Sequence, residues 1–209
     1  MSEILGTTIR SLYISGSATL ISSLWSIPLA YALASSRKSS QIASLLEALV
    51  GVPTVLVGLL LYLLLSRQGP LGILGMLYTP QAIILGESIL VTPLLTSVAF
   101  RVLRYSIETY GELAYTLGSS SRQAMALAVT QSLPGLASAM VMAFSRAIGE
   151  LGVALLVGGN LRGYTRTLTT AIALEVSKGE FQDAISLGTI LVVVMVLISF
   201  VLRLLRRLQ

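Results

Sequence analysis

Residues 104–122, RYSIETYGELAYTLGSSSR, form a polar segment between two strongly apolar stretches. Thr109 and Glu112 have the spacing of a capping box, which predicts that a short helix begins at Thr109. Gly118 follows, and glycine readily adopts the left-handed conformation that ends a helix. The segment therefore predicts a short helix that begins at Thr109 and ends at Gly118.

A second capping box follows the glycine, at Ser120 and Gln123, so two short helices are expected, hinged at Gly118. Four apolar residues of the first helix recur with helical spacing and share one face: Tyr110, Leu113, Ala114 and Leu117. So short a helix cannot bury this stripe by itself, and the chain has no obvious soluble part to cover it. The stripe therefore predicts a partner protein that binds here from the water side.

The composition of the chain places the rest of it in a lipid bilayer. Its 209 residues are 55% hydrophobic and only 11% charged, with a mean hydropathy of +0.87, whereas a soluble domain has about 25% charged residues. Stretches of about 20 apolar residues can span a bilayer, and five are present: about 10–34, 42–66, 81–100, 132–157 and 182–202. We expect one all-α, multi-pass domain over residues 1–209 in the plasma or inner membrane, with its first span retained as a helix.

Basic residues near the ends of these spans predict the orientation. With the N-terminus outside and the C-terminus in the cytoplasm, more arginine and lysine residues lie in inner loops than in outer ones. The segment 104–122 then faces the cytoplasm. The net charge of +5 is explained by basic anchors at the membrane surface, so no nucleic-acid partner is expected.

Cysteine and histidine are both absent. Their absence excludes disulfides, thiolate nucleophiles, serine–histidine chemistry and nearly every zinc site. No phosphate loop of the GxxxxGK[ST] type occurs either, so the sequence offers no means of hydrolysing a nucleotide. We expect no catalytic residue, no metal site and no cofactor in this chain.

Glycine and proline interrupt most of the spans, which indicates a bundle that bends and moves. They are Pro28, Gly51, Pro53, Gly58, Gly86, Pro93, Pro134, Gly149 and Gly152. Residues 67–80 are predicted to form an outer loop with a short interfacial helix. Residues 168–176 are apolar but too short to cross about 30 Å of lipid, so they predict a half-helix.

Three charged residues fall within the third and fourth predicted spans. Arg146 lies near the middle of the fourth span and Glu150 follows one helical turn later, so the two can pair; Glu87 lies at similar depth in the third span. A charge at such depth costs about 2.5–3.5 kcal/mol and needs a partner or a wet cavity. Two interpretations remain open, a structural ion pair and a gate on a translocation path.

A polar cluster follows the fourth span on the outer side. It combines fixed positive charge with hydroxyl and amide groups, a set that suits a tetrahedral oxyanion. The cluster consists of Asn160, Arg162, Thr165, Arg166, Thr167, Thr169 and Thr170. We expect Arg162 and Arg166 at the outer mouth, and Asn160, Thr165, Thr167 and Thr169 along the path with Arg146 and Glu150. Ordinary interface residues are the alternative.

Two parts of the sequence resemble one family of membrane proteins. Glu112-Leu-Ala114 with Gly118 six residues after the glutamate, and Leu133-Pro134 further on, resembles the EAA loop of ABC-importer permeases, with Leu113 in place of the usual alanine. Phe144 to Gly188 is similar to the corresponding stretch of tungstate and molybdate permeases. Its GGN, TRTLTTAIALE and KGEF elements look closest to the tungstate branch.

The resemblance implies a five-helix type I permease fold that works as a homodimer. Two ABC ATPase subunits would bind ATP and Mg inside, and an oxyanion-binding protein would dock outside. The residues implied in ATPase coupling are Tyr110, Glu112, Leu113, Ala114, Leu117 and Gly118, in a coupling loop at about 104–122. Tungstate is the expected anion, with molybdate or sulfate as alternatives. A membrane scaffold or assembly protein that docks a cytosolic partner is the alternative from another class, and a secondary transporter is a third.

Overall fold

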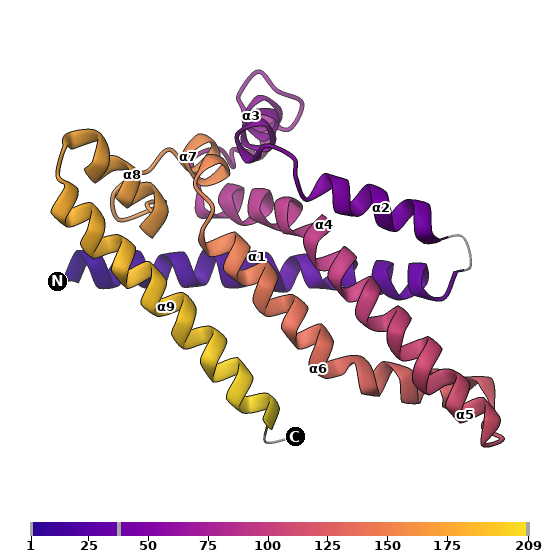
Figure 1. Ribbon diagram of the computed structural model, residues 1–209. Coiled ribbons are helices and arrows are strands. Elements are labelled where there is room, and N and C mark those ends of the chain that lie inside the picture. The colour runs from indigo at the N-terminus through magenta and orange to yellow at the C-terminus, as the bar shows by residue number, and fades with distance from the viewer. Residues whose placement is uncertain (1, 37–38, 208–209) are drawn as a thin grey trace. The chain divides into compact units, whose positions relative to one another are not determined.

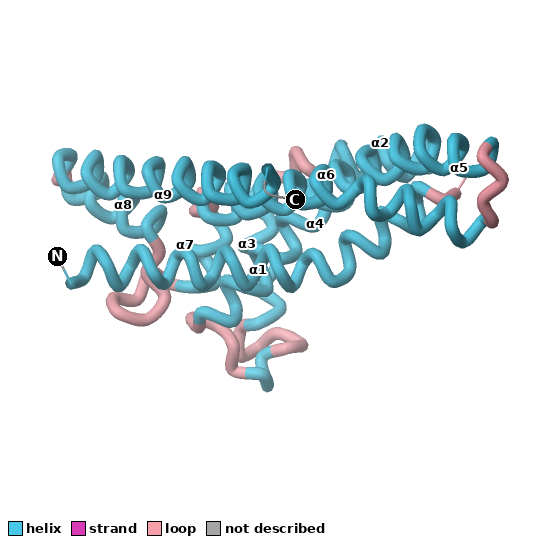
Figure 2. Tube along the Cα trace, turned by 90° about the horizontal axis from the view of Figure 1, so that it is seen from below, coloured by secondary structure: helices cyan, strands magenta, loops and turns pink. Residues whose placement is uncertain are grey.

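The computed structural model of the protein describes residues 2–36 and 39–207, and every regular element within these ranges is helical (Figures 1 and 2). The all-α prediction is confirmed for this part of the chain. The elements are α1 (Ser2–Ala34), α2 (Ser39–Leu49), α3 (Thr54–Leu65), η1 (Gly72–Leu74), α4 (Pro80–Ser106), η2 (Ile107–Gly111), α5 (Glu112–Thr116), α6 (Ser121–Ile148), α7 (Gly152–Gly158), α8 (Leu168–Lys178) and α9 (Phe181–Arg207).

Four helical segments of the described chain are long and apolar enough to cross a bilayer: Glu3–Ala34, Pro80–Thr116, Ser121–Ile148 and Phe181–Phe200. Helix α3 is strongly apolar but has only 12 residues, a rise of about 18 Å. The apolar stretch 168–176 lies within α8, which has 11 residues, as expected of a half-helix. In the predicted loop 67–80, η1 forms one short 3₁₀ turn.

Two of the predicted spans are not continuous helices. The stretch 42–66 is broken between α2 and α3, because Pro53 has no N–H to donate and disfavours helical backbone at the residue before it. The stretch 132–157 is broken between Ile148 and Gly152, where α6 ends and α7 begins. By contrast, Pro28, Pro93 and Pro134 stay inside α1, α4 and α6.

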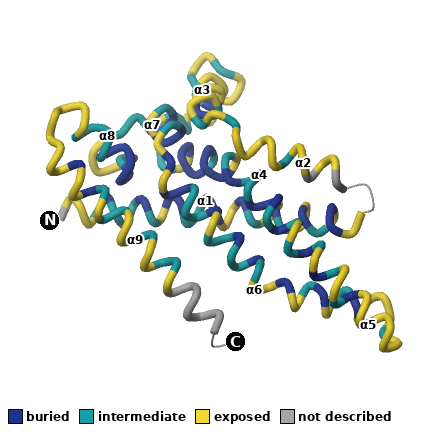
Figure 3. The backbone as a smooth tube through the Cα atoms, in the orientation of Figure 1, coloured by how far each residue is buried: buried dark blue, intermediate teal, exposed yellow. Residues whose placement is uncertain are grey.

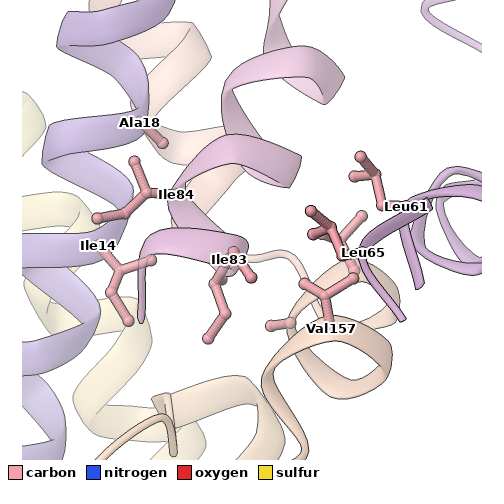
Figure 4. Close-up of a cluster of buried hydrophobic side chains, with 10 residues drawn as sticks. Ile14, Ala18, Leu61, Leu65, Ile83, Ile84 and Val157 are labelled. Carbon is pink, nitrogen blue, oxygen red and sulfur yellow. The ribbon is translucent and has the colours of Figure 1, made fainter. Parts of the chain in front are cut away.

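The chain forms two compact units, and α1, α4 and α6 each contribute to both. The first unit contains residues 1–21, 52–91 and 144–209. Its largest core brings together side chains of α1, α3, α4 and α7, with isoleucines and leucines from different helices in contact (Figure 4). The core residues are Ile14, Ala18, Leu61, Leu65, Ala82, Ile83, Ile84, Val153, Ala154 and Val157. A second cluster joins α8 to α9 through Leu168, Ala171 and Leu187.

The second unit contains residues 22–51 and 92–143. Its core is rich in alanine, which lets helices approach closely in a membrane protein. Ala30, Ala34, Ala99, Leu103 and Leu136, from α1, α4 and α6, form it. A hydrogen-bonded group of polar side chains lies in the same unit, where the Ser22 hydroxyl and the Trp25 indole both contact the Thr92 hydroxyl at 3.1 Å and 2.8 Å.

The buried face of α1 carries several hydroxyl side chains among its small and apolar residues, and its exposed face is largely apolar, unlike that of a soluble amphipathic helix. Buried and exposed residues alternate along α1 with helical period (Figure 3). The buried polar residues are Thr7, Ser11, Ser15, Thr19, Ser22 and Ser26, and the exposed apolar ones include Leu5, Ile9, Tyr13, Leu20 and Leu24. A membrane protein is expected to place hydroxyl groups between its helices and apolar side chains against the lipid.

Candidate functional site

The polar segment 104–122 contains no helix start at Thr109, so the first predicted capping box is wrong. Backbone residues stay helical from Pro80 through Thr116, and Ile107–Gly111 form a π-helical turn within this run. The N–H groups near Thr109 find acceptors in the preceding turns, so they need no side-chain cap. Single π turns within α-helices occur frequently at functional sites.

Gly118 ends the helix as predicted. Its φ angle is +83°, in the left-handed region. The N–H of Gly118 donates to the Tyr115 carbonyl and the N–H of Ser119 donates to the Ala114 carbonyl, both at 3.0 Å. This pair of bonds is a Schellman motif with glycine at the position that requires positive φ.

The second predicted capping box is confirmed at the start of α6. The Ser120 N–H donates to the Gln123 side-chain oxygen at 3.0 Å, and the Gln123 N–H donates to the Ser120 hydroxyl at 3.4 Å. The Tyr115 hydroxyl also lies 2.9 Å from the Ser121 hydroxyl, which ties α5 to the first turn of α6. The connection between the two helices is therefore tight and defined by short-range bonds.

The predicted apolar stripe of this segment is only partly exposed. Leu113 and Leu117 are 54% and 78% exposed, while Ala114 is 4% exposed. Tyr110 lies within the π turn, which shifts it from the α-helical register, and it is half-buried. Two leucines thus project outward, next to the exposed Glu112, and the alanine packs inward. The coupling role of these residues stays a prediction.

Arg104 holds the beginning of this segment, and sequence analysis missed it. Its guanidinium donates to the carbonyl oxygens of Ala34 at 3.1 Å and Ser36 at 3.2 Å, and to the Glu108 carboxylate at 2.5 Å. The Arg104–Glu108 spacing is visible in the sequence, but the contact with the end of α1 spans about 70 residues of chain and depends on packing.

The predicted pair of Arg146 and Glu150 is confirmed, with the guanidinium 2.7 Å from the carboxylate. The Glu150 side chain is almost completely buried, whereas the Arg146 side chain is 35% exposed. The second carboxylate oxygen of Glu150 accepts a hydrogen bond from the N–H of Val153 at 3.3 Å, in the first turn of α7. One carboxylate therefore connects the last turn of α6 to the first turn of α7.

The same break receives a third contact from α8. The Thr169 hydroxyl donates to the backbone carbonyl of Glu150 at 2.7 Å and lies 3.0 Å from the Thr167 hydroxyl. This carbonyl lies where α6 has ended, so it would lack an intrahelical partner. Glu150 therefore contacts three helices, α6, α7 and α8. These contacts stabilise the break in the predicted fourth span.

Glu87 lies in the same unit and is 1% exposed. One of its carboxylate oxygens has no hydrogen-bond partner among the described residues. Ser15 of α1 hydrogen-bonds the side chain, and Glu150 is near enough to interact with it electrostatically. All three charged residues singled out in the predicted spans therefore lie in one unit.

The hydroxyl groups of the threonine cluster form hydrogen bonds with nearby backbone groups. Thr165 is fully buried, donates to the Gly158 carbonyl at 2.5 Å and accepts from the Leu161 N–H at 2.9 Å. Thr167 is the N-cap of α8 and forms a reciprocal capping box with Thr170, with N–H to hydroxyl distances of 2.9 Å and 3.3 Å. These hydroxyls fix the turn between α7 and α8. Their place on a translocation path stays a prediction.

The two predicted outer-mouth arginines share one carboxylate. Arg162 donates its Nε to Glu3 at 2.6 Å, and this hydrogen bond raises the pKa of the Arg162 guanidinium. Arg166 lies 3.6 Å from the same carboxylate and donates to the Asn160 side-chain oxygen at 3.1 Å. The Arg162 side chain is 74% exposed and that of Arg166 is 17% exposed. Only Arg162 presents most of its charge to the surroundings.

Replacement of Gly159 by alanine is expected to destabilise this region more than the same change at Gly163. Both residues have positive φ, +68° and +76°, so alanine at either costs about 1–2 kcal/mol. A Cβ at Gly159 would also lie 2.7 Å from the Tyr78 ring, whereas a Cβ at Gly163 would meet no atom within 4 Å. The thermal midpoints of the two purified variants in detergent measure the difference. Equal midpoints would show that the Tyr78 contact adds nothing.

The described residues form several bilayer-length helices with buried hydroxyls between them and a capped polar segment, and this arrangement is that of a multi-pass membrane protein. It belongs to the family described as binding-protein-dependent transport system inner membrane components, whose model matches residues 13–209. Members of this family are transport components of the inner membrane, and this chain is one of them.

Three curated relatives are similar to this chain over most of its length. A probable anion ABC transporter permease protein of Haloferax volcanii is 36% identical, with 91% of this chain and 85% of the relative covered. The tungstate uptake system permease protein TupB of Peptoclostridium acidaminophilum is 36% identical, with 92% and 85% covered. The molybdenum transport system permease protein ModB of Haemophilus influenzae is 27% identical, with 93% and 91% covered.

A solved structure shares the fold at low identity. The crystal structure of an amino acid ABC transporter with histidines aligns with a TM-score of 0.66 at 20% identity, and covers 100% of this chain and 94% of that one. Such a likeness supports the architecture alone, because one fold carries many substrates.

Proposed function

We propose that this chain is the membrane-spanning permease subunit of an ATP-driven importer for tungstate. The observation that carries the proposal is the 36% identity to a tungstate uptake permease over 92% of this chain. The identity to a molybdenum permease is lower, 27%, and this difference favours tungstate over molybdate. Molybdate is the second candidate, because that relative also covers 93% of the chain.

The permease works as a homodimer with two ABC ATPase subunits on the cytoplasmic side and an oxyanion-binding protein outside. ATP and Mg are bound by the ATPase subunits. In this arrangement the N-terminus is outside and the C-terminus cytoplasmic, as the positive-inside rule favours. The four bilayer-length helices and the pair α2 and α3 supply the five spans, with the second span broken at Pro53.

The coupling segment is the part of the geometry that best supports this function. Leu113 and Leu117 are exposed on a short helix that is closed by the Gly118 turn and tied to α6. Exposed leucines beside a rigid turn offer a small apolar surface for a groove on a partner. We assign this surface to the ATPase, with Glu112 at its edge.

We assign the arginine and threonine residues of 158–170 to the outer turn of the translocation path. Thr165, Thr167 and Thr169 hydrogen-bond the backbone of this turn. They therefore act on the anion indirectly, by fixing the shape of the turn. Arg162 provides exposed positive charge that attracts a dianion or an acidic patch of the binding protein. Glu150 contacts this turn through the Thr169 hydroxyl and pairs with Arg146, and we assign these two charged residues to the gate.

The test is uptake by the assembled transporter in proteoliposomes, with ATP enclosed and the loaded binding protein outside. Tungstate uptake that depends on ATP, with molybdate a weaker competitor and sulfate an ineffective one, is the expected result. Preferential molybdate uptake would change the substrate assignment while leaving the permease assignment in place. Uptake that is independent of ATP would refute the importer itself.

A further inference from the structure

Arg104 lies in the last turn of α4 and contacts the end of α1. Its Nη1 donates to the carbonyl of Ala34 at 3.1 Å and to that of Ser36 at 3.2 Å. Ala34 is the last residue of α1, so its carbonyl is one of the acceptors that a helix end leaves without an intrahelical donor, and Ser36 follows two residues later. A cation at this position also complements the negative end of the helix dipole.

The same guanidinium reaches the π turn on its other side. Its Nε donates to the Glu108 carboxylate at 2.5 Å, and Glu108 lies within the π turn that precedes α5. Arginine can do this because its planar fork presents several fixed donors at once. One side chain therefore joins the end of α1 to the segment that carries Leu113 and Leu117.

Side-chain packing joins these two parts only at the beginning of the π turn, where Ile107 packs against the alanine-rich core. The end of α1 is packed through Ala30, Ala34 and Leu103 in the alanine-rich core. Beyond it, a cleft of about 310 Å³ opens between residues of α1, the π turn, α5 and α6, and Arg104, Glu108, Glu112 and Tyr115 are among its lining residues. Across such a cleft, directional polar contacts fix position where side-chain packing cannot.

We propose that Arg104 is a positioning residue for coupling: it clamps the end of α1 to the π turn and so sets where α5 meets the ATPase. The proposal rests on the proposed permease function. Movement of α5 then carries the end of α1 with it, so both move as one body when the ATPase changes state. Without the clamp, α5 moves while α1 lags behind.

A distance measurement tests the clamp independently of transport. The chain has no cysteine, so spin labels at Ser35→Cys and Thr116→Cys, both exposed positions, report only on α1 and α5. Pulsed electron paramagnetic resonance on permease dimers in which one labelled protomer is paired with an unlabelled one is expected to give one narrow distance distribution, and Arg104→Gln is expected to broaden it. An unchanged distribution in Arg104→Gln overturns the clamp, whatever the transporter carries.

The second measurement is the number of ATP molecules hydrolysed for each tungstate ion imported by the assembled transporter. Arg104→Gln removes charge-assisted bonds and is expected to raise this ratio about tenfold. Arg101→Gln is the matched control, one turn earlier on α4, because Arg101 forms an exposed ion pair with Glu47 at 3.2 Å. The control is expected to keep the ratio of the unmodified protein.

Two milder variants serve if Arg104→Gln does not fold. Arg104→Lys keeps the charge at the end of α1 but cannot serve all three acceptors, and Glu108→Gln keeps the bonds to α1 but loses the ion pair. Both are expected to give intermediate ratios and intermediate broadening. The proposal is overturned if both variants give the ATP ratio and the distance distribution of the unmodified protein. It is also overturned if Arg101→Gln has an effect as large as theirs. A transporter that imports no tungstate refutes the proposed substrate, and the label distances still decide the role of Arg104.

Discussion

Gly118→Val is expected to uncouple ATP hydrolysis from transport. A β-branched residue at a φ of +83° is strained, at a cost of about 1–2 kcal/mol. That corresponds to about a five- to thirtyfold loss in the population of the native turn. No atom lies within 4 Å of the position where a Cβ would be, so the strain comes from the backbone alone. The turn relaxes by opening the Schellman bonds, and α5 loses its fixed position.

The readout is the ratio of ATP hydrolysed to tungstate imported in proteoliposomes, which is expected to rise while ATPase activity remains. Gly179→Val is a close control, because Gly179 has a φ of +82°, ends α8 and also has no atom near its Cβ position. The control carries the same local strain at a different helix end. A normal ratio in Gly118→Val, or an equal rise in both variants, would show that the Gly118 turn does not position the coupling helix.

Short-range chemistry explains which features the sequence could predict. The Gly118 stop and the Ser120–Gln123 box depend on residues within five positions of each other, and the structure has both. The pair of Arg146 and Glu150 follows from helical spacing in the same way. The predicted box at Thr109 failed although its spacing was right, because a capping box needs a helix to begin there, and the preceding helix continues.

Long-range packing explains what the sequence could not predict. The pattern of hydroxyls in 165–170 is compatible with an anion site, but each threonine hydroxyl is used by a backbone group whose position depends on how α7 and α8 turn. The cap that Arg104 places on α1 joins residues about 70 positions apart. Gly149 and Gly152 mark the break in the fourth span in the sequence, but the hydrogen bond from Thr169 to the Glu150 carbonyl depends on how α8 packs.

Arg146→Met is expected to be the most damaging single change in the membrane-embedded part of the chain. It leaves the Glu150 carboxylate, 2% exposed, without its cation, and an uncompensated buried charge costs about 3–5 kcal/mol. Glu150→Gln is expected to be milder, because the amide oxygen still accepts from the Val153 N–H and because the Arg146 side chain is 35% exposed to its surroundings. The structure thus predicts an asymmetric pair.

The double variant Arg146→Met with Glu150→Gln decides whether the two residues act as a unit. Its loss of stability is expected to be clearly smaller than the sum of the two single losses, measured by reversible unfolding in mixed micelles containing SDS. Lys178→Met with Glu175→Gln is a control cycle on a more exposed pair at 2.9 Å, with an expected coupling of about 0–1 kcal/mol. Additive losses at Arg146 and Glu150 would mean that the carboxylate is stabilised chiefly by the Val153 N–H, and that Glu150 closes the break between α6 and α7 without its cation.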